Sequence, residues 1–199
     1  MICSVFQRPT GPAMEARVKG IVFNLLAEVV QSEHGEDTWD ALLDAAHADG
    51  SYTSLGNYPD EELARLIAAA SAALQTPADT IVRWFGRRAL PLLAERYPGF
   101  FVAHTSTRSF LLTLNDIIHK EVRKLYPGAD VPVFEFDTSS PEILVMGYRS
   151  PRRLCALAEG FIEGAAAHYG EQVTLEQPIC MNRGDAKCLL KVSLTVAST

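Results

Sequence analysis

The sequence lacks an excess of positive charge, long apolar runs and a dense set of cysteines. Its 18 Lys and Arg stand against 24 Asp and Glu, which gives a formal net charge of −6 and a pI near 5.4. Phosphate binding needs a clustered basic surface, so we expect no nucleic-acid partner. No apolar run approaches the roughly 20 residues of a membrane-spanning helix, and residues 1–17 contain no signal-peptide core. We therefore expect a cytoplasmic protein without a membrane partner.

The four cysteines are too few for the disulfide framework of a secreted protein. They stand at Cys3, Cys155, Cys180 and Cys188, so three of them cluster late in the chain. Cys180 and Cys188 flank a segment of turn composition, where a zinc site or a thiol redox switch is physically possible. The alternative is that all three are ordinary small core residues.

The length of 199 residues fits one domain, and 48% hydrophobic with 21% charged residues is typical of a globular protein. We interpret residues 1–17 as a flexible extension or a misplaced start, because they contain Pro9, Gly11 and Pro12 without helical periodicity. Apolar spacing predicts helices over residues 19–32, 37–47, 60–74, 78–97 and 106–125. Pro91 predicts a kink or a break in the fourth of these.

The character of the sequence changes after Pro127-Gly128. Alternating runs predict strands over residues 131–137 and 142–148, then a helix over 151–169, then strands over 172–179 and 187–196. The fold class is therefore α+β. We expect a helical N-terminal subregion packed on a C-terminal four-stranded antiparallel sheet with an inserted helix.

Two features carry binding chemistry. His119 lies on an otherwise largely apolar helical face, where an imidazole can serve as a metal ligand. The run Tyr148-Arg149-Ser150-Pro151-Arg152 follows 29 residues later and offers a phenol, a hydroxyl and a guanidinium, which suit the carboxylates of a planar ligand. Together they suggest a buried heme. Taken singly, His119 could be a core histidine, and the run could be a strand leading into a helix with solvated arginines.

The chain from Lys19 to about Leu194 resembles the heme-nitric oxide/oxygen binding family, the bacterial relatives of the soluble guanylate cyclase sensor domain. The resemblance rests on Lys19-Gly20-Ile21-Val22-Phe23-Asn24, Ile118-His119-Lys120-Glu121-Val122, Pro132, Tyr148 to Arg153 and Glu159-Gly160. It implies a single heme-binding sensor domain over residues 18–196, with a distal subregion over 18–76, a proximal one over 77–196 and heme b between them.

By the same resemblance, His119 is the iron ligand, and Pro132 presses on the porphyrin. Tyr148, Ser150 and Arg152 bind its propionates. Members that hold oxygen carry a distal tyrosine nine residues after the motif tyrosine, and here that position is Leu157. The other distal candidates are apolar as well. They are Val22, Leu26, Ala89 and Phe161.

The resemblance therefore implies a non-enzymatic sensor that binds NO and CO, excludes O2, and signals through release of His119. The partners it suggests are a separate sensor histidine kinase or a diguanylate cyclase/phosphodiesterase. A related subgroup binds zinc through three cysteines and one histidine, whose place Gln177 takes here. The alternative function is a heme-free small-molecule-binding domain like the vinyl-reductase-type modules, with a zinc or thiol-redox site at Cys155, Cys180 and Cys188. We find no distal acid–base pair for peroxide chemistry.

Overall fold

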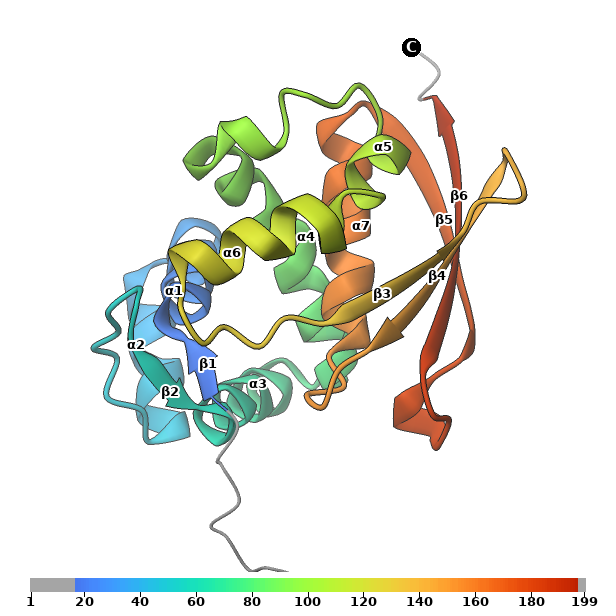
Figure 1. Cartoon of the computed structure of the whole chain (residues 1–199). Coiled ribbons are helices and arrows are strands. Elements are labelled where there is room, and N and C mark those ends of the chain that lie inside the picture. The colour runs from blue at the N-terminus through green and yellow to red at the C-terminus, as the bar shows by residue number, and fades with distance from the viewer. Residues whose placement is uncertain (1–16, 197–199) are drawn as a thin grey trace, which may run out of the picture.

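A computed structural model describes residues 17–196, and it confirms the α+β architecture (Figure 1). The predicted extension over residues 1–17 lies outside this range except for Arg17. The N-terminal part consists of two short strands and three helices: β1 (Arg17–Lys19), α1 (Gly20–His34), α2 (Glu36–Ala46), β2 (Asn57–Pro59) and α3 (Asp60–Leu74). Strands β1 and β2 pair antiparallel, with Val18 opposite Tyr58. The sequence did not predict this pair, because three-residue strands are too short to show alternation.

Helix α4 (Ala78–Arg96) continues through Pro91, so the break considered at that residue does not occur. The proline ring leaves the Arg87 carbonyl without its usual helical partner. This stretch of α4 packs closely on α7 (Cys155–His168), where a Cβ on Gly164 would lie 2.9 Å from the Arg87 oxygen. The helix is thus supported along its length by a neighbour with small side chains.

The single helix predicted over residues 106–125 is wrong. The segment consists of α5 (Thr107–Leu111), a π-helical turn (Leu114–Ile118) and α6 (His119–Leu125). Ser106 is the N-cap as expected, since its Oγ accepts a hydrogen bond from the Ser109 N–H at 3.2 Å. The break has a tertiary cause, because the Asn115 side chain bonds to a strand rather than lying free on a helix surface. Local apolar spacing cannot report such a contact.

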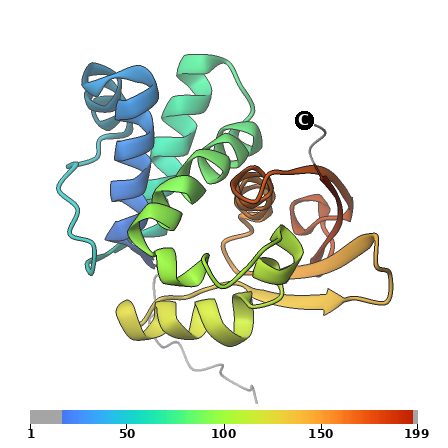
Figure 2. The same cartoon turned by 90° about the horizontal axis from the view of Figure 1, so that it is seen from above.

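The C-terminal sheet has the strand order β3-β4-β6-β5, and all its pairs are antiparallel. Its strands are β3 (Val133–Asp137), β4 (Ile143–Arg149), β5 (Glu171–Ile179) and β6 (Cys188–Val196). Helix α7 begins at Cys155 rather than in the predicted first turn at Pro151. Seen from above, α7 lies in the hollow of the curved sheet, with the N-terminal helices beyond it (Figure 2).

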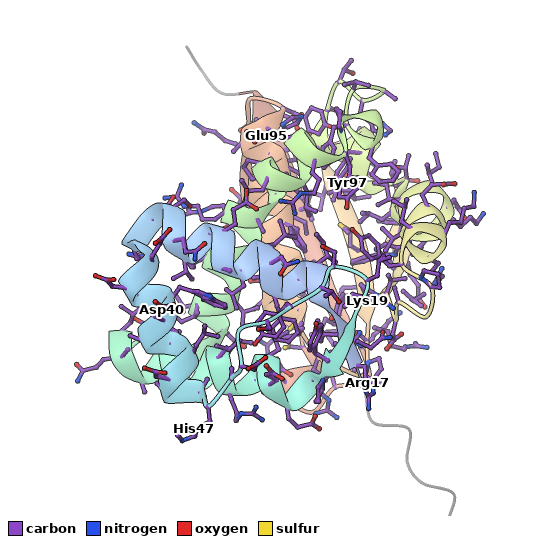
Figure 3. All side chains as sticks on the ribbon, turned by 90° about the vertical axis from the view of Figure 1, so that its left-hand side faces the viewer. Arg17, Lys19, Asp40, His47, Glu95 and Tyr97 are labelled. Atoms are coloured by element: carbon purple, nitrogen blue, oxygen red, sulfur yellow. The ribbon has the colours of Figure 1, made fainter. Side chains whose placement is uncertain are left out.

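Two clusters of buried apolar residues form the core. Helix α4 contributes to both, with Phe85 and Ala89 in the N-terminal cluster and Leu90 and Ala94 in the C-terminal one. Arg17 and Lys19 lie at one end of the N-terminal helices, and Asp40 of α2 and its C-cap residue His47 lie at the other (Figure 3). Within residues 17–196, no helix has the length and apolar character needed to cross a membrane.

Candidate functional site

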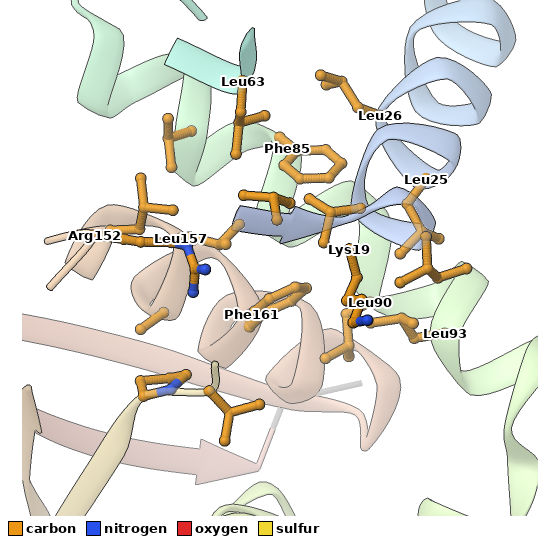
Figure 4. A pocket seen from close by; sticks show the side chains of 18 of the residues that line it. Lys19, Leu25, Leu26, Leu63, Phe85, Leu90, Leu93, Arg152, Leu157 and Phe161 are labelled. Atoms are coloured by element: carbon orange, nitrogen blue, oxygen red, sulfur yellow. The ribbon is translucent and has the colours of Figure 1, made fainter. Parts of the chain in front are cut away.

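A cavity of about 910 Å³ separates the N-terminal helices from the segment that carries His119. It is lined mainly by apolar side chains, among them Leu26 of α1 and Leu157 and Phe161 of α7 (Figure 4). Nine of the ten predicted cofactor-binding residues line this cavity. They are His119, Tyr148, Ser150, Arg152, Pro132, Val22, Leu26, Leu157 and Phe161. The chain thus brings together residues that are up to 139 positions apart (161 − 22).

Ala89 does not line the cavity, contrary to the sequence prediction. It is fully buried within the N-terminal core cluster. The next residue on helix α4, Leu90, does line the cavity. A small apolar residue in a helix gives no local indication of which side it faces.

His119 is the first residue of α6, directly after the π-helical turn. Burial lowers the pKa of its imidazole to about 4, the charge of Arg123 adds to this effect, and the Pro132 backbone opposes it. The ring is therefore neutral near pH 7, which is the form that binds a metal through a nitrogen lone pair. Its Nδ1 is buried without a hydrogen-bond partner among the described residues, and its ring stacks on Phe134 at 5.8 Å.

The Tyr-Ser-Arg run lies where β4 ends and the chain turns toward α7. Arg153 has a φ of 52°, and its N–H donates to the Ser150 carbonyl at 3.1 Å, so the turn is tight. The Ser150 hydroxyl accepts a hydrogen bond from the Arg152 backbone N–H at 3.3 Å. Burial raises the pKa of Tyr148 to about 12, and a hydrogen bond with Ser150 opposes the rise. The phenol is thus a neutral donor, suited to a carboxylate.

Arg152 is mostly buried and contacts three separate segments. Its Nε lies 2.9 Å from Asp60 Oδ2, on the first turn of α3. Its two terminal nitrogens donate to the backbone carbonyls of Asp130 at 2.7 Å and Arg17 at 2.5 Å. The guanidinium therefore joins the N-terminal helices to the C-terminal part at the edge of the cavity.

Sequence reasoning missed two charged residues of this region. Asp60 was identified only as a helix start, because no local feature of the sequence connects it with Arg152. Lys19 is 8% exposed, lines the cavity, and donates from Nζ to the Leu55 carbonyl at 3.4 Å. It is the last residue of β1, a strand that the sequence did not predict.

The three predicted cysteines do come together, outside the cavity. The sulfurs of Cys155, Cys180 and Cys188 lie within 4.8 Å of one another, and all three residues are buried. The turn between β5 and β6 requires a left-handed residue, which Gly184 supplies at φ 101°. Burial raises the pKa of Cys155 to about 12 and also raises that of Cys188, while the Gln177 side chain lies close enough to lower the Cys155 value. The cluster has no histidine, and an amide is a poor zinc ligand.

Comparisons with known proteins agree with this arrangement. A family model described as haem-NO-binding matches residues 19–177. A crystal structure of an H-NOX protein from Shewanella oneidensis, in the Fe(II)NO ligation state, superposes with a TM-score of 0.84 at 32% identity, covering 89% of this chain and 99% of that one. A mutant of the S. oneidensis protein in the Fe(II) state gives a TM-score of 0.85 at 31% identity, with coverage of 92% and 98%.

An H-NOX protein from K. algicida shares the fold, with a TM-score of 0.81 at 22% identity over 92% of this chain and 99% of that one. The family match covers His119, Pro132 and the whole Tyr148 to Arg152 run, together with the helices that surround the cavity. The chain therefore belongs to the haem-NO-binding (H-NOX) family, whose members are heme-based sensor domains.

Proposed function

We propose that this protein is a heme b sensor of nitric oxide, which also binds carbon monoxide and excludes oxygen. The observation that carries this proposal is the lining of one cavity by His119, by the Tyr-Ser-Arg run and by Leu157. The S. oneidensis relative solved in the Fe(II)NO and Fe(II)CO states supports gas binding at such a site. Sensing rather than catalysis is the role we assign.

The residues present fit a heme. The cavity volume lies within the range of sites for large organic ligands. His119 offers a neutral imidazole whose Nδ1 is unpartnered. The bound group would supply an iron atom that coordinates diatomic gases. His119 would ligate that iron, and Pro132 would contact the ring.

The carboxylates of the cofactor would be bound at the turn after β4. Tyr148 and Ser150 each offer a hydroxyl donor, and Arg152 offers positive charge. Because Arg152 already pairs with Asp60 at 2.9 Å, a propionate would share the guanidinium with this side chain or displace it.

Selectivity against oxygen would come from the apolar wall formed by Leu157, Phe161 and Val22. A hydrogen-bond donor to a partly charged oxygen ligand contributes about 1.5–3 kcal/mol, and this wall would supply none. Nitric oxide depends much less on such a donor. A side chain without hydrogen-bonding groups at Leu157 therefore favours NO.

Release of His119 would allow α6 to move, and this movement would be the signal. A helix that can occupy two positions relative to a sheet is a common switching element. We propose that a separate sensor histidine kinase, or a diguanylate cyclase/phosphodiesterase, reads this movement.

Absorption spectroscopy of the purified chain tests the proposal. We expect a Soret band in the ferrous protein from heme-replete cells, a shift of that band on addition of NO, and no stable complex with oxygen in air. His119→Gly should lose heme unless imidazole is supplied. His47→Gly, the same change at an exposed histidine on the C-cap of α2, should retain it. Absence of the band in the unmodified chain would refute heme binding.

A further inference from the structure

The side chain of Asn115 makes two hydrogen bonds to the backbone of one residue in the sheet. Its Nδ2 donates to the Phe134 carbonyl at 2.6 Å, and its Oδ1 accepts from the Phe134 N–H at 3.1 Å. Asn115 belongs to the π-helical turn and stands four residues before His119. We call this pair of bonds the Asn115 clamp.

The clamp takes the place of a neighbouring strand. Strand β3 lies at the edge of the sheet, and within the described chain it pairs only with β4. In an antiparallel pair, the N–H and C=O of one residue point to the same side. At Phe134 both groups are therefore turned away from β4, and the carboxamide satisfies them as a strand would.

The ring of Phe134 extends this connection into the cavity. It stacks on His119 at 5.8 Å with an interplanar angle of 29°. It also lies 5.7 Å from the ring of Tyr148, its partner in register on β4. Phe134 is thus fixed to the His119 segment by its backbone and touches both binding features through its side chain.

We propose that Asn115 is a positioning residue for His119, and that its clamp couples the position of the His119 segment to the β3–β4 hairpin. The clamp holds His119 toward the cavity and resists its withdrawal. When the segment does move, it moves Phe134 and strand β3 with it. The second half of this inference rests on the proposed heme function, whereas the clamp itself does not.

The clamp can be tested in heme-free protein by amide hydrogen exchange. We expect Asn115→Leu to accelerate hydrogen exchange at the Phe134 amide by about tenfold. Each hydrogen bond of this kind slows the opening that exposes the amide by a factor of several, and the variant loses both. Asn115→Ala serves the same purpose should the leucine variant not fold. Asn24→Leu is the matched control, since it removes a hydrogen bond that the Asn24 side-chain amide donates to Ser54 Oγ, and neither residue lines the cavity. Unchanged exchange at Phe134 in a folded Asn115 variant overturns the proposal.

The coupling is tested in the heme-loaded full chain. At one equivalent of NO, the absorption spectrum reports the fraction of iron that has lost His119. We expect this fraction to rise at least about twofold in Asn115→Leu or Asn115→Ala, and to stay unchanged in Asn24→Leu. The vibration of the iron–imidazole bond without NO should also shift to lower frequency. A residue that merely covers the sheet edge would change thermal stability alone, and that result would refute the positioning role.

If the unmodified chain binds no heme, the proposed function fails. Hydrogen exchange at the Phe134 amide still decides whether the clamp holds the strand.

Discussion

At the scale of single residues, Leu157 contributes an apolar side chain to the wall of the cavity. It lies on α7 and faces the cavity together with Phe161 (Figure 4). The sequence predicted this position from the resemblance alone, since it is defined by its distance from Tyr148. An apolar side chain at that point offers no hydrogen bond to a bound gas.

We expect Leu157→Tyr to raise the oxygen affinity of the ferrous protein by roughly ten- to a hundredfold, because a phenol donor is worth about 1.5–3 kcal/mol to a partly charged acceptor. Oxygen titration followed by absorption spectroscopy measures the change. Leu157→Phe supplies the same ring without the hydroxyl and should bind oxygen as weakly as the unmodified chain. Equal affinities of the two variants would show that the donor is not the cause.

Gln177 lies close to the buried thiol of Cys155, at the position that the resemblance to a zinc-binding subgroup assigns to a histidine. We expect Gln177→His to retain close to one zinc per chain after dialysis, because an imidazole completes a tetrahedral set with three thiolates. The unmodified, reduced protein should retain less than about a tenth of an equivalent. Elemental analysis gives both values. Gln172→His, an exposed position on the same strand, is the control, and zinc in all three proteins would contradict the expectation.

At the scale of elements, the contact between α4 and α7 depends on glycine. A Cβ on Gly160 would lie 2.1 Å from the Arg83 carbonyl oxygen and 3.0 Å from the Arg87 nitrogen. Both are backbone atoms of α4, so no side-chain movement can relieve the clash. Leu157 and Phe161 belong to α7, as Gly160 does, so the close approach of the two helices also places these two side chains at the cavity.

Gly160→Ala should lower the free energy of unfolding by about 3 kcal/mol, because the two helices must separate to admit the methyl group. For a chain of this length, the midpoint of thermal unfolding should fall by roughly 6–12 °C. Gly99→Ala is a suitable control, since nothing lies within 4 Å of the added Cβ there, and its midpoint should hardly change. Circular dichroism on heating measures both, and a shift of the same size in both variants would argue against the packing explanation.

At the scale of the whole molecule, Arg152 joins the two halves. The pair that it forms with Asp60 has side chains only 12% and 21% exposed, and its backbone contacts reach β1 and the segment before β3. Removal of one partner from such a pair leaves a partly buried charge without compensation.

Asp60→Asn should therefore destabilise the heme-free protein by about 1–3 kcal/mol. Chemical denaturation of the heme-free chain provides the measurement. Glu121→Gln breaks a pair with Lys124 whose side chains are 40% and 70% exposed, and it should cost under about 1 kcal/mol. A cost for Asp60→Asn no greater than this control would show that the contact does not hold the halves together.

The sequence by itself determined the α+β class and the extent of most helices and strands, because periodicity is a local property, and it singled out His119 and the Tyr-Ser-Arg run by their residue types and spacing. Only the tertiary structure decided the π-helical turn before His119, the partners of Arg152 and the exclusion of Ala89 from the cavity. Each of these depends on groups far apart in the chain, such as Asn115 with Phe134 or Arg152 with Asp60. Whether a helix stays regular, and which neighbour a charge finds, is settled by packing energies that no single stretch of sequence contains.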